Sequence, residues 1–438
     1  MVIFDRIQLD YSQKNIPLPS NDSYLKSLIA KTESFIKRVR WKVFFFENPS
    51  DKESSEEKYG FRSTKTPPQN TALNQFESDM YDLISNVEFK STKTQFQEKM
   101  IKDIREIQNS GKVILPADKT NNLYKVSAED YNKLLHDSIT TEYRKSSEET
   151  KLNIDKESAV IANSLKIADR MQSYTTDQCF ITVKDHKPNF PSKPSCRLIN
   201  PSKSDLGKVS KQILEKINKV SNRSLRLNQW RKTKDMTDWF KGLNTTNDKN
   251  MRLIQYDIEA FYPSITEALL DKALDFAGEY CSISESDKRI IKQAKKSLLF
   301  NDKSCWVKKN NDLFDVTMGS YDGAECCEIV GLYLLHKISN TLNLDPNLNG
   351  LYRDDGLIAV PKANGRKMDI IRKKLHKLFK DEGLKIVVET DLVIANSLDV
   401  TLNLNDGTYK PYRKPNDTPL YIHKDSNHPH QSRQIWSL

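Results

Sequence analysis

The chain has 438 residues, of which 69 are Lys or Arg and 59 are Asp or Glu, giving a formal net charge of +10. No apolar run approaches the ~18–20 residues of a membrane span, and the first residues lack a signal-peptide pattern, so an intracellular protein without a membrane partner is predicted. The basic balance favours a polyanionic partner without proving one, and the six cysteines and seven histidines lack zinc-site spacing, which predicts free thiols.

Residues 1–109 are predicted to form a basic, mostly helical N-terminal extension. Residues 35–42 interleave cations with aromatic side chains. This pattern favours a helix with one buried face and one solvated basic face, and a surface that stacks on bases is the alternative. Polar, Ser-rich residues 51–58 predict a loop, and helices are predicted over residues 74–87 and 94–108.

Residues 110–250 alternate between strand and helix patterns. Strands are predicted at residues 113–115 and 123–126, on either side of a turn at Asp118 and Lys119, and helices at residues 128–135 and 147–171. Residues 179–201 are predicted to be rich in strand. The amphipathic pattern of residues 207–220 predicts a helix whose lysines form a solvated face or follow a template backbone.

Asp257 stands at the end of an alternating run, residues 253–258, that predicts a strand. Pro263 should end the extended structure. Ser264 and Glu267 match a Ser-x-x-Glu capping box for a helix with apolar residues at helical spacing. Asp257 is therefore expected at the end of a strand, just before a helix that packs beneath it.

Residues 352–356 read Tyr-Arg-Asp-Asp-Gly between apolar runs, which predicts a strand, a turn and a second strand. Asp355 and Gly356 are expected to supply the turn and to push Asp354 into solvent. A lone Asp-Asp-Gly is usually just a turn. Paired with Asp257, however, it predicts a two-metal phosphoryl-transfer site, in which the ions lie roughly 3.5–4 Å apart.

Beyond this motif the pattern predicts a basic helix at residues 365–382 and a strand at residues 384–388. Residues 399–404 and 408–413 flank Asn-Asp-Gly at 405–407, which is a strong hairpin signal.

At this point the sequence resembles a reverse transcriptase. The two carboxylate motifs occur in the order of that family, and residues 115–122, 181–188 and 197–201 look like the fingers of Penelope-like retroelements. The resemblance implies an α+β right-hand polymerase: fingers over residues 110–250, then a palm over residues 251–395, whose antiparallel sheet is backed by helices. Residues 396–438 would form a primer-grip-like hairpin and the start of a truncated thumb. No endonuclease signature follows, so a fragment or a degenerate copy is expected.

The resemblance also assigns roles to single residues. Asp257, Asp354, Asp355 and the carbonyl of Ile258 would hold two Mg²⁺ ions, with Mn²⁺ as the alternative. Lys119 and Arg197 would grip the triphosphate, with Lys184 and Lys187 as further candidates, and Gly319 would lie in the nucleotide loop. Tyr262 would exclude a ribose 2′-hydroxyl, and Lys385 would protonate pyrophosphate. The plainer alternatives are surface ion pairs for Lys119 and Arg197, a core tyrosine at 262 and a solvated lysine at 385.

The function implied is an RNA-directed DNA polymerase of a retrotransposable element. Its partners would be an RNA template, a DNA primer and deoxynucleoside triphosphates, and a nuclear location is expected from the family. One alternative is a catalytically inactive nucleic-acid-binding remnant. The other is a family B DNA polymerase, because residues 261–265 also resemble a motif of that family, although the Asp354-Asp355 pair departs from its second motif.

Overall fold

The computed structural model describes residues 2–428 apart from short stretches at 10–11, 13–14, 17, 19–20, 50–58, 60–65, 89–92, 169–170, 172–176, 244–249, 310–312, 415–416 and 419. The loop predicted over residues 51–58 lies outside the described residues. None of the helices in the described part of the chain is long and apolar enough to cross a membrane.

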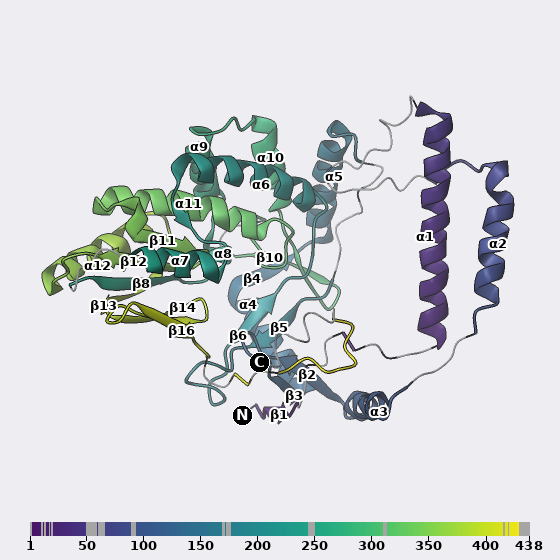
Figure 1. The fold of residues 1–438 in the computed structure, drawn as a ribbon, viewed down its shortest axis with the longest axis horizontal. Coiled ribbons are helices and arrows are strands. Elements are labelled where there is room, and N and C mark those ends of the chain that lie inside the picture. Colours follow the sequence, from purple (N-terminus) through teal and green to yellow (C-terminus); the bar gives the residue numbers. More distant parts are fainter. Residues whose placement is uncertain are drawn as a thin grey trace.

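A five-stranded sheet forms the centre of the palm (Figure 1). β8 (Arg252–Ile258) lies between β12 (Asp355–Val360) and β13 (Ile386–Leu392) and is antiparallel to both. β11 (Asn349–Tyr352) pairs with the other edge of β12, and the short β7 (Asn228–Gln229) runs parallel to β11. The sheet therefore joins segments that are more than 150 residues apart in the sequence.

Helices cover one face of this sheet because alternate residues of the strands are apolar on that side. α6 (Leu206–Leu225), α9 (Glu267–Gly278), α11 (Gly323–Leu342) and α12 (Gly365–Asp381) pack there. α10 (Glu285–Ala294) packs on α6. The resulting core includes Ile254 and Tyr256 of β8 and Ile358 of β12, all fully buried.

The opposite face of the sheet has its own core, which contains the intervening residues Leu253, Leu357 and Ala359. α7 (Thr233–Leu243) packs against this face, together with a sheet of β14 (Ile394–Ser397), β15 (Val400–Asn403) and β16 (Thr408–Pro411). The hairpin predicted around residues 405–407 is present, and β14 is a third strand that the sequence reading missed.

The fingers consist of small antiparallel sheets around a separate core. β2 (Lys112–Pro116) and β3 (Leu123–Ser127) pair as predicted, and β1 (Asp5–Ile7) joins the edge of β3, so residues 5–7 belong to this sheet rather than to the helical extension. β5 (Phe180–Val183) pairs with β6 (Cys196–Ile199), and α4 (Ala128–Glu142) packs beside them.

Two groups of elements cross the division between fingers and palm drawn from the sequence. β4 (Tyr143–Ser146) forms a sheet with β9 (Leu299–Asn301) and β10 (Ser304–Lys308), near α5 (Glu148–Ser164). In the other direction, α6, β7 and α7 precede residue 251 but pack with the palm.

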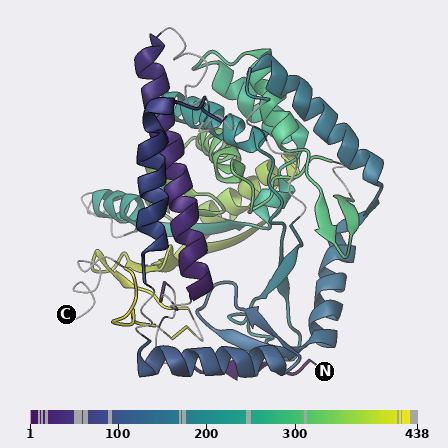
Figure 2. The same ribbon diagram turned by 90° about the vertical axis from the view of Figure 1, so that its right-hand side faces the viewer.

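The N-terminal helices form a hairpin beside this body. α1 (Asn21–Glu47) runs alongside α2 (Asn74–Ser85), and α3 (Gln95–Asn109) follows at the base of the fingers (Figures 1 and 2). The Arg40 guanidinium donates two hydrogen bonds to the Glu77 carboxylate and links the two helices. Thr94 and Gln97 form the capping box that begins α3.

After β16 the chain returns toward the N-terminal segments. The rings of His423 and Phe96 stack with their centroids 4.0 Å apart, and Ser12 bridges to Ile422. Among the described residues no helix follows α12. The described part of residues 396–438, where the start of a thumb was predicted, therefore contains no helix.

Candidate active site

Strand pairing brings the predicted carboxylates together at one end of the palm sheet. Asp257 in β8 lies directly opposite Asp355 in β12. The backbone N–H of Ile258 donates to the carbonyl oxygen of Asp354 at 2.9 Å. Asp257, Asp354 and Asp355 are thus neighbours, although 97 residues separate the first two along the chain.

The hairpin turn lies two residues earlier than predicted. Tyr352 pairs with Asp355, so the turn residues are Arg353 and Asp354, and Asp355 and Gly356 already belong to β12. Arg353 adopts a left-handed backbone with φ of 54°, a conformation that two-residue hairpin turns require. The assignment of the turn to Asp355 and Gly356 was therefore wrong. Asp-Gly is common in turns, but here both residues belong to strand β12.

Gly356 has a packing role instead. A Cβ at this position would lie 2.0 Å from Cζ of the Tyr256 ring, which is fully buried beneath the sheet. A Cβ on Gly350 in β11 would lie 2.1 Å from Cζ2 of the Trp230 ring. The hairpin therefore lies directly on two aromatic rings, and glycine is needed where no side chain fits.

The helix after Asp257 also begins differently from the prediction. Ala260, with φ of 48°, turns the chain into a short helix, α8 (Phe261–Ser264). α9 then begins after Thr266, whose hydroxyl accepts the N–H of Leu269. The predicted capping box of Ser264 and Glu267 is not formed, because Pro263 lies inside α8 and the chain has to turn again before α9.

Burial, together with mutual repulsion, raises the pKa of two of the carboxylates. Burial raises the pKa of Asp355 to about 6, and the negative charges of Asp354 and Asp257 act in the same direction. The side chain of Asp257 is open to the cleft, yet the surrounding protein displaces enough water, with Asp354 nearby, to raise its pKa as well. Such a set of oxygen ligands lowers its electrostatic energy when a divalent cation binds.

A cleft of about 490 Å³ places basic residues of the fingers opposite these acids. Lys119, Lys184, Lys187 and Arg197 all line it, as do the three aspartates. The charges of Lys119 and Lys187 act to lower the pKa of Asp257, which opposes the two effects that raise it. Burial and the charge of Arg197 lower the pKa of Lys184. The cleft therefore has an anionic floor and a cationic wall.

Arg197 forms an ion pair, which was the predicted alternative to triphosphate binding. It nevertheless lines the cleft. Its Nη1 lies 3.0 Å from Oδ1 of Asp118, whose side chain is 6% exposed. The guanidinium side chain is 29% exposed, so part of it faces the cleft. Asp118 thereby orients Arg197 without removing it from the site.

Asp185 anchors the cationic wall and was missed by the sequence reading. It is fully buried, and its Oδ2 accepts hydrogen bonds from Thr120 (2.7 Å), Asn122 (2.7 Å) and Tyr124 (3.0 Å). These contacts join the loop that carries Lys119 to the segment that carries Lys184 and Lys187. In the sequence Asp185 looks like one more charged residue among lysines, so no local signal distinguishes it.

A buried ion pair stabilises the segment that contains the predicted nucleotide loop. Lys295 of the segment after α10 donates to Asp322, both side chains are fully buried, and Ser210 of α6 donates to the same carboxylate. A Cβ on Gly319 would lie 2.4 Å from the carbonyl oxygen of Asn200. Thr317 and Met318 line the cleft, whereas the backbone of Gly319 packs so closely against the backbone of Asn200 that no side chain fits there.

Two predicted residues have other surroundings. Tyr262 lines the cleft and also packs against the main palm core, as its core alternative predicted; exclusion of a ribose 2′-hydroxyl stays a prediction. Lys385 is exposed and is not among the residues that line the cleft; its carbonyl accepts the N–H of Glu259 at 2.9 Å. The proposed proton transfer from Lys385 therefore has no support from its placement.

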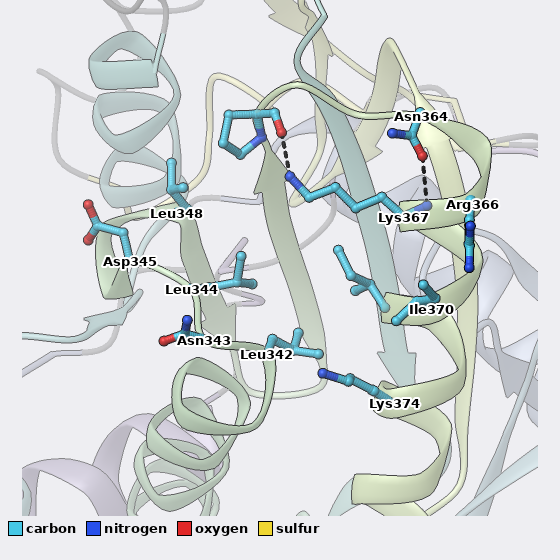
Figure 3. A pocket seen from close by; sticks show the side chains of 12 residues that line it. Leu342, Asn343, Leu344, Asp345, Leu348, Asn364, Arg366, Lys367, Ile370 and Lys374 are labelled. Atoms are coloured by element: carbon cyan, nitrogen blue, oxygen red, sulfur yellow. Dashed lines mark hydrogen bonds between the residues drawn. The ribbon is translucent and has the colours of Figure 1, made fainter.

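A second cavity, of about 550 Å³, lies between the end of α11 and the start of α12 (Figure 3). Leu342, Leu344 and Ile370 contribute apolar walls, and Lys367 is held by the carbonyl of Pro361 at 2.7 Å. None of the predicted site residues lines this cavity. The cleft at the carboxylates is therefore the candidate active site, although it is the smaller of the two.

The described residues contain no group of three or more His, Cys, Asp and Glu side chains arranged to hold a metal ion. The three aspartates are neighbours in the sheet, but their side chains do not form such a group. Hard oxygen donors of this kind fit Mg²⁺, which retains water and substrate phosphate among its ligands. Asp257, Asp354 and the carbonyl of Ile258 are the groups that would hold it.

Comparisons with known proteins show what this arrangement resembles. No family model matches the sequence, and no curated protein matches it either. The apo telomerase of Candida tropicalis is similar in structure, with a TM-score of 0.50 and 11% identity over 90% of this chain and 78% of that one. Telomerase from Candida albicans with a TWJ fragment of telomeric RNA (TM-score 0.48, 12% identity, 94% and 79% covered) and the RNA-dependent RNA polymerase of a human picobirnavirus (0.42, 10%, 81% and 74%) match less well.

At 11% identity the likeness to the Candida tropicalis telomerase concerns the fold alone. The chain has the fold of a reverse-transcriptase-like polymerase, with fingers and palm, and the predicted fold class is confirmed.

Proposed function

We propose that this protein is a template-directed nucleotidyltransferase, and specifically an RNA-directed DNA polymerase. The observation that carries the proposal is the opposition of Asp257, Asp354 and Asp355 to a wall of four cations in one cleft. Acids that hold metal ions and cations that hold phosphates are the two parts that phosphoryl transfer needs.

In this proposal the primer 3′-hydroxyl oxygen attacks the α-phosphorus of a deoxynucleoside triphosphate, a new phosphodiester bond forms, and pyrophosphate leaves. Lys119 and Arg197 bind the triphosphate oxygens and orient the leaving group. When bound, two Mg²⁺ ions would lower the pKa of the attacking hydroxyl and neutralise charge on the departing pyrophosphate. Asp257 and Asp354 hold those ions, and Asp355 supports them from the strand beside Asp257.

Tyr262 supports a deoxynucleotide rather than a ribonucleotide substrate. Its ring lies in the cleft wall, backed by the palm core, and a rigid ring beside C2′ of the sugar would clash with a hydroxyl. The finer assignment, a reverse transcriptase of a Penelope-like retroelement that acts in the nucleus on an RNA template and a DNA primer, rests on the motifs at residues 115–122, 181–188 and 352–355.

The test is primer extension with Mg²⁺ on matched RNA and DNA templates. We expect extension on RNA, and we expect Asp354→Asn to reduce it by at least about a thousandfold, because loss of metal binding removes several kcal/mol of transition-state stabilisation. Asp345→Asn is the matched control, since Asp345 lies in the turn before β11 and outside the cleft.

Three results would contradict parts of the proposal. Extension by Asp354→Asn at the wild-type rate would remove Asp354 from the metal site. A preference for DNA templates would favour the family B alternative. Tight template binding with no extension by the wild-type protein would favour the inactive remnant.

A further inference from the structure

The long N-terminal helix α1 has a basic surface that the cleft does not explain. It carries six Lys or Arg residues against three acids, whereas α2 carries three acids and no Lys or Arg. Thr32 and Ile36 are buried and Arg40 reaches Glu77 of α2, so positions 32, 36 and 40 mark the packed face of α1. The other residues of α1 whose burial is described are exposed or half-buried.

Three of these six cations lie along one edge of the packed face, beside Phe35, whose ring centroid is 6.2 Å from that of Phe76 in α2. Lys31, Arg38 and Lys42 are exposed and follow one another at intervals of seven and four residues, which places them on one stripe of a helix. None of these three forms an ion pair with another residue in the described part of the chain. The stripe extends for about 16 Å, the length of roughly five nucleotide steps along one strand of a duplex.

Two aromatic rings lie beside two of these cations. The Trp41 and Phe45 rings are stacked, with centroids 5.2 Å apart and planes inclined by 6°. Both belong to the same side of the helix as Arg38 and Lys42, and both are half-buried. Cations beside a flat apolar surface are the combination that contacts phosphates and sugars or bases of a nucleic acid.

The position of α1 relates this surface to the polymerase body. Figure 1 shows α1 between α2 and the fingers and palm, so the face away from α2 is turned toward the rest of the molecule. Figure 2 shows the two helices together on one side of the body. An acidic protein would also match the charge, but a nucleic acid already has to enter the cleft under the proposed function.

We propose that the stripe formed by Lys31, Arg38 and Lys42 binds the sugar–phosphate backbone of the template–primer outside the cleft. The inference rests on the proposed function for the identity of its ligand. It adds a second contact surface, on a helical hairpin far in sequence from the catalytic carboxylates. Backbone contacts of this kind increase affinity and give it salt dependence, and they carry no sequence preference.

The test uses the full chain and a labelled RNA template annealed to a DNA primer, with a DNA–DNA duplex as a second probe. Binding is measured without nucleotides across a series of salt concentrations. In the triple variant Lys31→Gln, Arg38→Gln, Lys42→Gln we expect the slope of log K against log salt to fall by about 2 to 3, and Kd near 0.1 M salt to rise on the order of tenfold or more. Glutamine keeps the helix propensity of α1.

A matched control removes the same charge elsewhere. Lys374, Lys377 and Lys380 are exposed on α12, on the back of the palm, and their change to glutamine should leave the slope close to the wild-type value. Equal losses for both probes in the α1 variant identify a general backbone contact, and a loss confined to the RNA-containing probe identifies an RNA contact; both support the inference.

An α1 variant with the wild-type slope would overturn the inference, as would an equal loss in the α12 control. The first result would leave an acidic protein as the partner of α1. Because binding is measured without synthesis, these results are independent of primer extension. A protein that binds through α1 but extends no primer would contradict the proposed function and leave the α1 contact intact.

Discussion

Replacement of Gly356 by alanine should disrupt the packing of β12 next to the candidate active site. The new Cβ would lie 2.0 Å from Cζ and 2.4 Å from both Cε atoms of Tyr256, well inside the closest approach of carbon atoms. Tyr256 is fully buried and its ring packs against Phe379, with centroids 5.7 Å apart, so the ring has no free space into which to move. The strand pair would have to separate where Asp355 faces Asp257.

Overpacking of a well-packed core usually costs about 1–3 kcal/mol. Here the clash involves three ring atoms and the backbone of a central strand, so we expect a loss of at least about 3 kcal/mol in the free energy of unfolding. We also expect primer extension to fall more than the loss of folded protein explains, because the carboxylates of β8 and β12 move apart. Urea denaturation and extension rates per folded molecule measure the two effects.

A double-mutant cycle tests the assigned cause. Tyr256→Leu removes the ring atoms that would meet the new methyl group, so Gly356→Ala should cost at least about 1 kcal/mol less in the Tyr256→Leu background. Gly278→Ala in α9 is the control, because a Cβ there meets nothing within 4 Å. Additive effects in the cycle, or a Gly356→Ala protein as stable as the control, would refute the reasoning.

Two further predictions concern buried charge. Because the pKa of Asp355 is raised to about 6, its ionised form opposes folding of the metal-free protein, and this group makes the protein more stable as the pH falls through 6 toward the ordinary aspartate value of 3.8. Asp355→Asn should therefore stabilise the chelator-treated protein by about 2 kcal/mol near pH 8, with the gain lost at acidic pH; a gain that does not change with pH would contradict the assigned pKa. Asp322→Asn should cost about 3–5 kcal/mol in urea denaturation, since it leaves Lys295 buried without its anion, and Lys295→Met should restore much of the loss; a cost below about 1 kcal/mol would show that the pair is not needed.

Local patterns in the sequence were sufficient for many elements. The strand that carries Asp257, the presence of a strand on each side of the Tyr-Arg-Asp-Asp motif, and the hairpin of β15 and β16 were predicted from alternation and turn residues. Helices α2, α3 and α12 begin and end within two residues of the predicted bounds, and α6 begins one residue before its predicted start. Such signals are contained in a few neighbouring residues, so no distant contact is needed to read them.

Other features depend on contacts that no local window contains. The turn lies at Arg353 and Asp354 because Asp355 pairs with Tyr352 in β11 and with Asp257 in β8, and glycine is required at 356 by a ring 100 residues earlier in the chain. β1 and β7 are three and two residues long and are strands because neighbouring segments supply their hydrogen-bond partners. Short strands of this kind have too few residues for a periodic signal.

What the sequence by itself determined is the chemistry: which acids and which cations exist, in what order, and next to which turns and strands. The tertiary structure decided their geometry: that Asp257 lies opposite Asp355, that Asp185 anchors the wall that carries Lys119, and that Lys385 lies outside the cleft. The reason is that residue type and local pattern act over a few bonds, whereas the distance between two side chains from remote segments depends on how strands pair and how helices pack.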